Sequence, residues 1–360
     1  MNQAKTGIFM SVVSTISMRV EQLIPSDLLA YSLNYICHLF HQEMMKNTVE
    51  ILVARHSTHM KLSLKKAKSP NPVLSVSTVI LSFVLWGCSK TEPPKQEIDF
   101  MSFNIRYGTA DDGENHWNTR KPLVFDVFTD HAPDVVGLQE ALDFQIEEIL
   151  EKHPQFASVG IGREPEGQGE HCAILYLKDT FEILEQDTFW LSDTPESPSS
   201  SWGNKLFRIY TYARIENRAN GSRFYIFNTH FDHRSENARK ESARFLVKQI
   251  ANRKHPEDPY ILMGDFNAGE DQAPILTLLG KNKASPHSNE APLVDTFRVL
   301  HPDALNVGTG TKWIGKVDGN KIDYVFAAPT TIVEKAEIIH DNDNGRYPSD
   351  HYPVKAKVRF

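Results

Sequence analysis

The chain has 360 residues, of which 40% are hydrophobic and 24% are charged, a balance typical of a globular protein with a sizeable core. The formal net charge is −7, but residues 1–88 are basic, so the other 272 residues carry 31 Lys or Arg against 42 Asp or Glu, a net of −11. This acidity argues against general binding to a phosphate backbone, and three widely spaced cysteines exclude a disulfide framework.

The segment 60–88 has the pattern of an export signal. Four lysines between positions 61 and 68 precede an apolar stretch, 73–86, that is too short for a confident membrane span. Leu85-Trp86-Gly87-Cys88 resembles a bacterial lipobox, with a bulky Trp86 where such motifs prefer a small residue. We therefore expect an exported protein, either secreted or anchored in the cell envelope by lipid on Cys88. An uncleaved anchor is the alternative.

The rest of the chain divides around this signal. Export signals stand at a true N-terminus, so we interpret residues 1–59 as a mis-assigned or disordered extension and Met60 as the start. A cytoplasmic extension before an anchor is the alternative. We expect residues 89–96 to form a flexible linker and residues 97–360 to form one domain.

The first half of this domain alternates strands and helices. An apolar run at 97–105 is too short for a helix and predicts a strand, which ends at Asn104. A polar loop follows, and Pro122 opens a helix that extends to about Thr129. The segment 133–140 predicts a second strand that passes directly into a helix with an apolar face.

The second half contains hairpins and shorter strands. The segments 171–176 and 181–184 predict a strand pair, and 207–215 with 223–227 predicts a hairpin around Asn220-Gly221. A helix over 235–252 comes next. Further strands are expected at 260–263, 322–326, 336–339 and 354–360. Strands interleaved with helices and hairpins indicate an α/β domain with mixed sheets.

Polar residues with catalytic potential stand where the predicted strands end. Mg²⁺ prefers one or two carboxylates plus water and substrate oxygens, and Glu140 and Asp323 suit that role. Asp265 and Asn267 lie two apart on extended chain, so both could point into one cleft, to orient water and to donate to a phosphoryl oxygen. Adjacent side chains diverge, so we expect Asp350 to orient His230 rather than its neighbour His351.

Taken together, the motifs resemble those of the endonuclease/exonuclease/phosphatase superfamily, which has the deoxyribonuclease-like fold. The motifs that carry the resemblance are Met-Ser-Phe-Asn104-Ile-Arg, Gly-Leu-Gln-Glu140, Asn-Thr-His230, Gly-Asp265-Phe-Asn267, Lys-Ile-Asp323-Tyr and Ser-Asp350-His351. The resemblance extends from about Ile98 to Phe360. It implies a four-layer α/β sandwich, in which two packed mixed sheets are flanked by helices, with hydrolysis of phosphoesters that depends on Mg²⁺ or Mn²⁺.

The resemblance also implies roles for single residues. Glu140 is the main metal ligand with Asn104 beside it, Asp265 aligns water, and Asn267 stabilises the phosphorane. His351 contacts the phosphate or acts as base, and His230 binds phosphate or assists the leaving group. Asp323 and Asp350 support the metal or the histidines. Arg208 and His171 are further candidates for substrate binding.

Several functions remain compatible with these residues. A nuclease or phosphodiesterase is the leading interpretation, and a phospholipid head group or another small phosphoester is an alternative substrate for an acidic protein held at a membrane. A non-catalytic binding module that kept the fold is the alternative from another class. The sequence contains neither His-Glu-x-x-His nor Gly-x-Ser-x-Gly, which argues against a zinc protease or a serine hydrolase. We expect a monomer.

Overall fold

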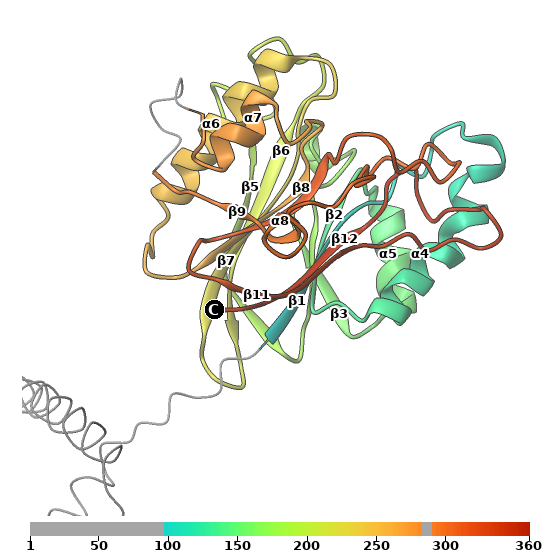
Figure 1. Ribbon diagram of the computed structural model, residues 1–360, viewed down its shortest axis with the longest axis horizontal. Helices are drawn as coiled ribbons and strands as arrows, with labels where there is room; N and C mark the ends of the chain where they lie inside the picture. Colours follow the sequence, from blue (N-terminus) through green and yellow to red (C-terminus); the bar gives the residue numbers. More distant parts are fainter. Residues whose placement is uncertain (1–96, 283–289) are drawn as a thin grey trace, which may run out of the picture. The chain divides into compact units, whose positions relative to one another are not determined.

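Two six-stranded sheets pack face to face in the computed structural model, which describes residues 97–282 and 290–360 (Figure 1). The export signal, the lipobox-like motif, the linker and the extension before Met60 lie outside the described residues. Within the described ranges, no helix is long and apolar enough to cross a membrane.

The first sheet joins the start and the end of the described chain, because β1 pairs with β2 in parallel and with β12 in antiparallel orientation. Its strands, in spatial order, are β11 (Ile332–Ile338), β12 (Val354–Arg359), β1 (Glu97–Asn104), β2 (Val135–Gln139), β4 (Ile174–Leu177) and β3 (Phe156–Val159).

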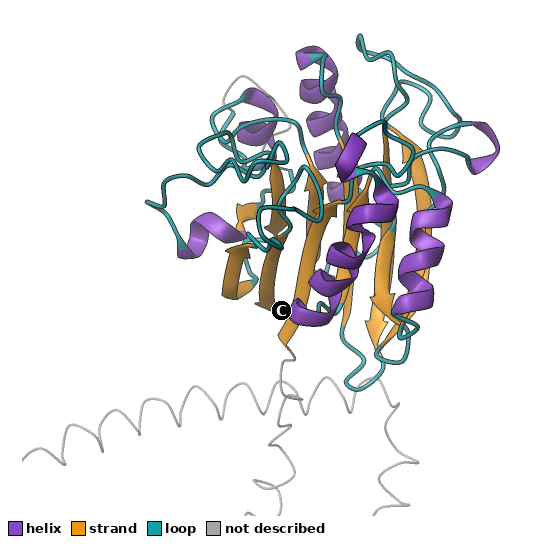
Figure 2. Ribbon diagram, turned by 90° about the vertical axis from the view of Figure 1, so that its right-hand side faces the viewer, coloured by secondary structure: helices purple, strands orange, loops and turns teal. Residues whose placement is uncertain are grey.

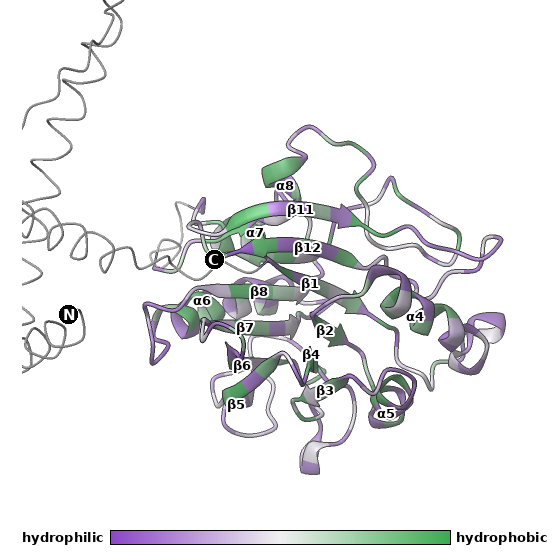
Figure 3. Ribbon diagram, turned by 90° about the horizontal axis from the view of Figure 1, so that it is seen from below, coloured by the Kyte–Doolittle hydropathy of each residue, from purple (hydrophilic) through white to green (hydrophobic). Residues whose placement is uncertain are grey.

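The second sheet comes from the middle of the chain, with β7 parallel to β8 and the other neighbours antiparallel. Its strands, in spatial order, are β5 (Phe181–Trp190), β6 (Ile209–Asn217), β7 (Arg223–His230), β8 (Tyr260–Asp265), β10 (Asp323–Ala327) and β9 (Val294–Asp295). Seen from below, the strands of the two sheets run nearly in line with one another (Figure 3).

Helices cover the outer face of each sheet, which completes four layers. The helices α4 (Trp117–His131) and α5 (Asp143–Lys152) pack on the first sheet, in front of the strands in Figure 2. The helices α6 (Glu236–Ala251) and α7 (Ala273–Leu278) pack on the second. The short elements α8 (Thr296–Leu300), η1 (Gly113–Asn115) and η2 (Pro165–Gly167) lie in connections. The predicted four-layer α/β sandwich is confirmed.

The core between the sheets explains why the central strands read as continuous apolar runs. All residues of β2, β8 and β10 are buried, as expected for strands that are covered on both faces. One polar seam crosses this core. Gln139 donates to the side chain of Asn228 at 2.6 Å, and Asn228 donates to the Leu138 and Ala173 carbonyls at 2.8 Å. These bonds tie the two sheets together beside the strand ends.

Two local predictions differ from the structure. The segments 171–176 and 181–184 do not pair, because β4 lies between β2 and β3 in the first sheet whereas β5 pairs with β6 in the second. The helix predicted from Pro122 begins earlier, at Trp117, because the His116 side chain accepts a hydrogen bond from the Asn118 N–H and caps it there. Pro122 lies inside α4.

Gly264, beside Thr229 in the β7–β8 pair, should not tolerate a side chain. Its φ is +151°, and an added Cβ would lie 2.1 Å from the Thr229 carbonyl oxygen. We expect Gly264→Ala to lower the free energy of unfolding in urea by about 2–5 kcal/mol, the combined cost of strained backbone and overpacking. Gly221→Ala is the control, since its φ is also positive but nothing lies within 4 Å, and it should cost only about 1 kcal/mol. Equal losses in both variants would contradict the steric argument.

Candidate active site

The predicted site residues converge at one edge of the two sheets. Asn104 ends β1 and Glu140 follows the parallel strand β2, so both emerge at the same edge of the first sheet. In the second sheet His230 and Asp265 end the parallel strands β7 and β8 and lie in register, and Asp323 begins the antiparallel strand β10 opposite Asp265. Strand direction therefore delivers five polar side chains to one place.

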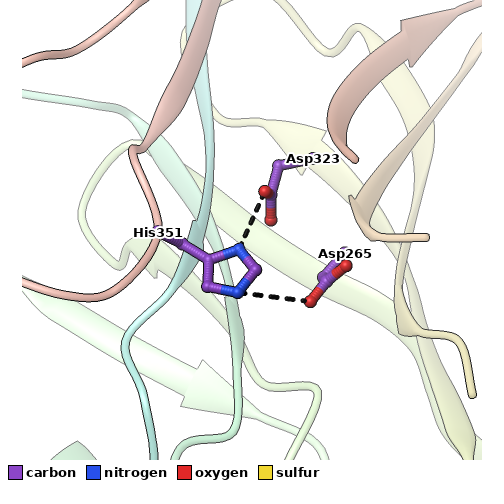
Figure 4. Close-up of side chains that lie close together, drawn as sticks. All are labelled: Asp265, Asp323 and His351. Atoms are coloured by element: carbon purple, nitrogen blue, oxygen red, sulfur yellow. Dashed lines mark hydrogen bonds and ion pairs between the residues drawn. The ribbon is translucent and has the colours of Figure 1, made fainter. Parts of the chain in front are cut away.

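A partly exposed histidine, His351, faces two buried carboxylates at the centre of this site (Figure 4). His351 Nδ1 lies 2.9 Å from Asp323 Oδ2, and its Nε2 lies 3.8 Å from Asp265 Oδ2. Ligand atoms of all three residues lie within 4.8 Å of one another, a spacing that could also hold a metal ion. Burial alone would lower the pKa of His351, but the charges of Asp323 and Asp265 outweigh it and raise the pKa well above its usual value.

Asp265 and Asn267 form a tight turn that reaches His230. The backbone N–H of Asn267 donates to Asp265 Oδ1 at 2.8 Å, and the side-chain Nδ2 of Asn267 lies 3.0 Å from His230 Nε2. Asn267 itself has a left-handed φ of 48°. Burial, with the charge of Asp323, raises the pKa of Asp265 to about 7. Burial, with the charges of Arg208 and Arg163, holds the pKa of His230 well below its usual value, so this imidazole is neutral.

Asn104 and Glu140 form the first-sheet side of the site. The Asn104 amide donates to Glu140 Oε1 at 3.1 Å and to Asp265 Oδ2 at 3.0 Å, so it bridges carboxylates from the two sheets. Glu140 has a left-handed φ of 57°, which is rare for a residue with a side chain and is typical of functional sites. Its Oε2 accepts the Tyr107 N–H at 3.2 Å.

Asp350 occupies a different position from the one predicted. We expected it to orient His230, but the carboxylate beside that imidazole is Asp265, with Oδ2 3.4 Å from Nε2. The carboxylate that holds His351 is Asp323. Asp350 Oδ2 instead lies 3.9 Å from Arg106 Nε, and Glu140 Oε2 lies 3.9 Å from Nη1 of the same guanidinium. Burial, with the nearby charge of Glu140, raises the pKa of Asp350. Two carboxylates that crowd one another in this way are a suitable pair for a divalent cation.

The two predicted substrate-binding residues have different surroundings. Arg208 is buried, its Nη2 lies 2.8 Å from His233 Nδ1, and it lines a narrow cavity together with Glu140 and His230. His171 lines the same cavity, but its Nδ1 lies near the backbone carbonyls of Ala141 and Gly169 at 3.2 and 3.1 Å. The imidazole of His171 is thus engaged with the backbone that leads into α5.

Three residues that sequence reasoning did not single out hold the site together. Arg120 is buried and donates to the carbonyls of Asn115, Ile105, Pro348 and Arg106, which ties the end of β1 to the loop before His351. Ser349 Oγ donates to the Asn104 carbonyl at 2.7 Å. Arg106 lies inside the motif that contains Asn104, and Ser349 begins the motif that contains His351, so both had a usable signal, whereas Arg120 carried no recognisable one.

Neutralising Asp265 should stabilise the metal-free protein. Its carboxyl titrates at a pKa of about 7 when folded, against 3.8 as its ordinary value, so the folded state holds this proton more tightly. The stability that this proton provides is present below pH 4 and is lost as the pH rises through 7. We therefore expect the free energy of unfolding of Asp265→Asn to be higher than that of the wild type. The difference should grow as the pH rises from 4 to 7 and should reach the order of a few kcal/mol.

The measurement is urea unfolding at pH 5 and pH 8 with chelator present. Asp179→Asn, at an exposed turn, is the control and should show no pH-dependent difference. A gain for Asp265→Asn that is the same at both pH values would contradict the assignment of the shift to this carboxyl.

Comparisons with known proteins agree on one group. A family model described as the endonuclease/exonuclease/phosphatase family matches residues 101–351. The crystal structure of an endonuclease/exonuclease/phosphatase from Bacteroides vulgatus is 30% identical with a TM-score of 0.65, and the alignment covers 74% of this chain and 100% of that one. A mannosyl-6-phosphatase from Bacteroides thetaiotaomicron is 30% identical with a TM-score of 0.64, over 73% of this chain and 100% of that one.

A curated relative is longer. Nocturnin from Drosophila melanogaster is 27% identical over 277 residues, which cover 66% of this chain but 41% of that protein. The chain therefore spans about two fifths of the length of this relative.

Proposed function

Because this chain belongs to the endonuclease/exonuclease/phosphatase family, we propose that it hydrolyses phosphoesters with the help of a divalent metal ion, Mg²⁺ or Mn²⁺. The family match and the named relatives support a phosphoesterase or nuclease role. The observation that carries the proposal is the convergence of Asp265, Asn267 and the His351–Asp323 pair at one sheet edge. These residues supply an acceptor for a proton of water and donors for phosphoryl oxygens.

The acidic pair at the edge of the first sheet fits the metal. Glu140 would hold the ion with Asn104 and Asp350, since both carboxylates face the same cationic group, Arg106. Asp323, which the sequence suggested as a ligand, is already bonded to His351 and suits a positioning role better. When bound, the ion would neutralise phosphate charge and lower the pKa of a coordinated water.

The residues of the chain then divide the acid–base work. Asp265, with a pKa near 7 and a fixed Oδ1, can align a water molecule and accept its proton. His351 has a raised pKa and so carries a proton, which it can donate to a phosphoryl oxygen, while Asp323 fixes its ring. The Asn267 amide and His230 lie together on the other side, where they can contact the remaining phosphoryl oxygens or the leaving group.

The substrate class has two candidates. A nucleic acid or another phosphodiester is the first. A small phosphomonoester is the second, and it is favoured by the 30% identity to a mannosyl-6-phosphatase that this chain covers completely. We also propose that the protein is an exported monomer, held at the cell envelope by lipid on Cys88. At that location a phospholipid head group is a further possible substrate.

The proposal is tested by a hydrolysis screen on the full chain. The panel contains single- and double-stranded DNA, RNA, sphingomyelin, hexose 6-phosphates and chromogenic mono- and diesters, each with Mg²⁺ and with chelator. We expect turnover of at least one ester that chelator abolishes and that Asp265→Ala removes. A folded wild type that hydrolyses none of them would favour the binding-module alternative, and turnover unaffected by chelator would contradict the metal.

A further inference from the structure

Arg208 has hydrogen-bonding capacity that the protein itself does not satisfy. Its side chain is only 4% exposed, yet its Nε and Nη1 have no hydrogen-bond partner within the described part of the chain. Nη2 is used by His233, and the nearest carboxylate oxygen, on Asp232, lies 3.7 Å from Nε, beyond hydrogen-bond distance. Donors of a buried charged group are costly to leave unmet, so this arrangement suits a bound anion.

A second guanidinium faces the same space. Arg163 makes a two-pronged ion pair with Glu170 at 2.8 and 2.7 Å. Its buried Nε has no hydrogen-bond partner within the described residues, since the carboxylate oxygen of Glu164 lies 3.7 Å away. Both arginines line the narrow cavity that also contains Glu140, Glu170 and His230, so their guanidinium groups lie close to the reacting groups. The charge of Arg208 also acts on Asp265, which places it within electrostatic range of the proposed base.

The number of negative charges on the phosphate decides what this cavity accepts. A phosphomonoester carries about −1.5 to −2 charges at neutral pH, whereas a diester carries one. Glu140 and Asp265 at the site would repel the additional charge. The charge of Arg208 offsets that repulsion, whereas Arg163, paired with Glu170, adds a donor at Nε rather than a net charge. Phe207 and Ile209 also line the cavity, so apolar side chains border it beside the charged groups.

We propose that Arg208, assisted by Arg163, binds the terminal oxygens of a dianionic phosphate and makes phosphomonoesters the preferred substrates of this site. The inference rests on the proposed phosphoester hydrolysis and refines it, because it chooses between the two substrate classes. Arg208 is a substrate-binding residue in this account, and the fork of its guanidinium matters as well as its charge.

The test compares two chromogenic esters on the full chain with Mg²⁺. These are 4-nitrophenyl phosphate and bis(4-nitrophenyl) phosphate, measured as kcat/KM for the wild type, Arg208→Met and Arg208→Lys. We expect the wild type to prefer the monoester at least about 10-fold. Arg208→Met should lose about 10²-fold or more on the monoester, equivalent to roughly 2.7 kcal/mol, but less than 10-fold on the diester. Arg208→Lys should lie between them.

A matched control is available on β6, the strand that begins directly after Arg208. Arg214 is also buried and ends in an ion pair with Asp258 at 2.7 Å, but it lies six residues further along the chain, roughly 20 Å on an extended strand. Arg214→Met should therefore change stability without changing the ratio of the two esters. Inhibition by inorganic phosphate provides a second readout, and Arg208→Met should weaken it by a factor similar to its loss on the monoester.

The outcomes separate this inference from the function beneath it. Hydrolysis of both esters with equal losses in Arg208→Met, or a wild type that prefers the diester, would overturn the monoester subsite and leave phosphoester hydrolysis standing. If the protein hydrolyses neither of these esters and none of the others in the screen above, both the monoester subsite and phosphoester hydrolysis are overturned. If Arg208→Met does not fold, the ester ratio and phosphate inhibition of Arg208→Lys decide the matter in the same way.

Discussion

Replacing His351 by alanine should lower kcat by about 10²–10⁴-fold, the range typical of a lost general acid or base. The imidazole is held by Asp323 at 2.9 Å and approaches Asp265, so its removal takes away the proton donor at the centre of the site. The free energy of unfolding should change by far less than the activation free energy that corresponds to this loss in kcat. The measurement is steady-state hydrolysis beside urea unfolding of the same sample.

The partner of His351 allows a sharper form of the experiment. Asp323 acts through His351, so Asp323→Asn combined with His351→Ala should be no slower than His351→Ala alone. In Asp323→Asn alone, the pH at which activity falls on the alkaline side should move down, because the carboxylate that raises the pKa of His351 has lost its charge. Fully additive losses, or an unchanged alkaline limb, would contradict the pairing.

A second His–Asp pair serves as the control. His131 Nε2 lies 2.6 Å from Asp341 at the C-terminal end of α4, away from Trp117 and Arg120 at its other end. His131→Ala should therefore leave kcat within about twofold of the wild type, since His131 lies at the opposite end of α4 from Arg120, which contacts the site.

Replacing Glu140 by glutamine should greatly weaken the binding of Mg²⁺. The amide keeps the size of the side chain and can still accept the Tyr107 N–H, but it loses the charge that faces Asp350 and Arg106. We expect the Mg²⁺ concentration for half-maximal activity to rise at least about 10–100-fold. Without substrate, Mg²⁺ should raise the Tm of the wild type and leave that of Glu140→Gln unchanged.

Glu148 provides the matched comparison for this substitution. It lies on α5, eight residues further along the chain, where it pairs with Lys121 and accepts from the Trp117 indole. Glu148→Gln should keep the wild-type response to Mg²⁺ in both measurements. A normal Mg²⁺ response in Glu140→Gln would move the metal to the group of Asp265, Asp323 and His351, whose ligand atoms lie within 4.8 Å of one another.

The sequence could predict which residues meet, but not all of their partnerships. Asn104, Glu140, His230 and Asp265 each end or follow a strand, so the period and direction of strands were enough to place them at one edge. The reasoning that adjacent residues diverge also holds, because His351 turns to Asp323 while Asp350 turns to Arg106. The identity of the carboxylate beside His351 depends on antiparallel register, which a single sequence does not encode locally.

Other features were out of reach for a similar reason. The strand β3 has four residues, 156–159, too few to show a hydrophobic period, so the sequence analysis did not predict it. Without β3, the segment 171–176 was wrongly paired with 181–184. The role of Arg120 depends on carbonyl groups brought from positions 105 and 348, so nothing near it in the sequence could reveal it. Such contacts between distant positions are settled by tertiary packing alone.

The pairing of β1 with β12 has a consequence for the timing of synthesis. Asn104 belongs to the first described strand, whereas His351 precedes by three residues a strand that must pair with β1. A ribosome-bound chain can therefore form most of the second sheet before His351 has joined Asn104 at the site. Hydrolysis should therefore begin only after residues 354–359 have left the exit tunnel and paired with β1.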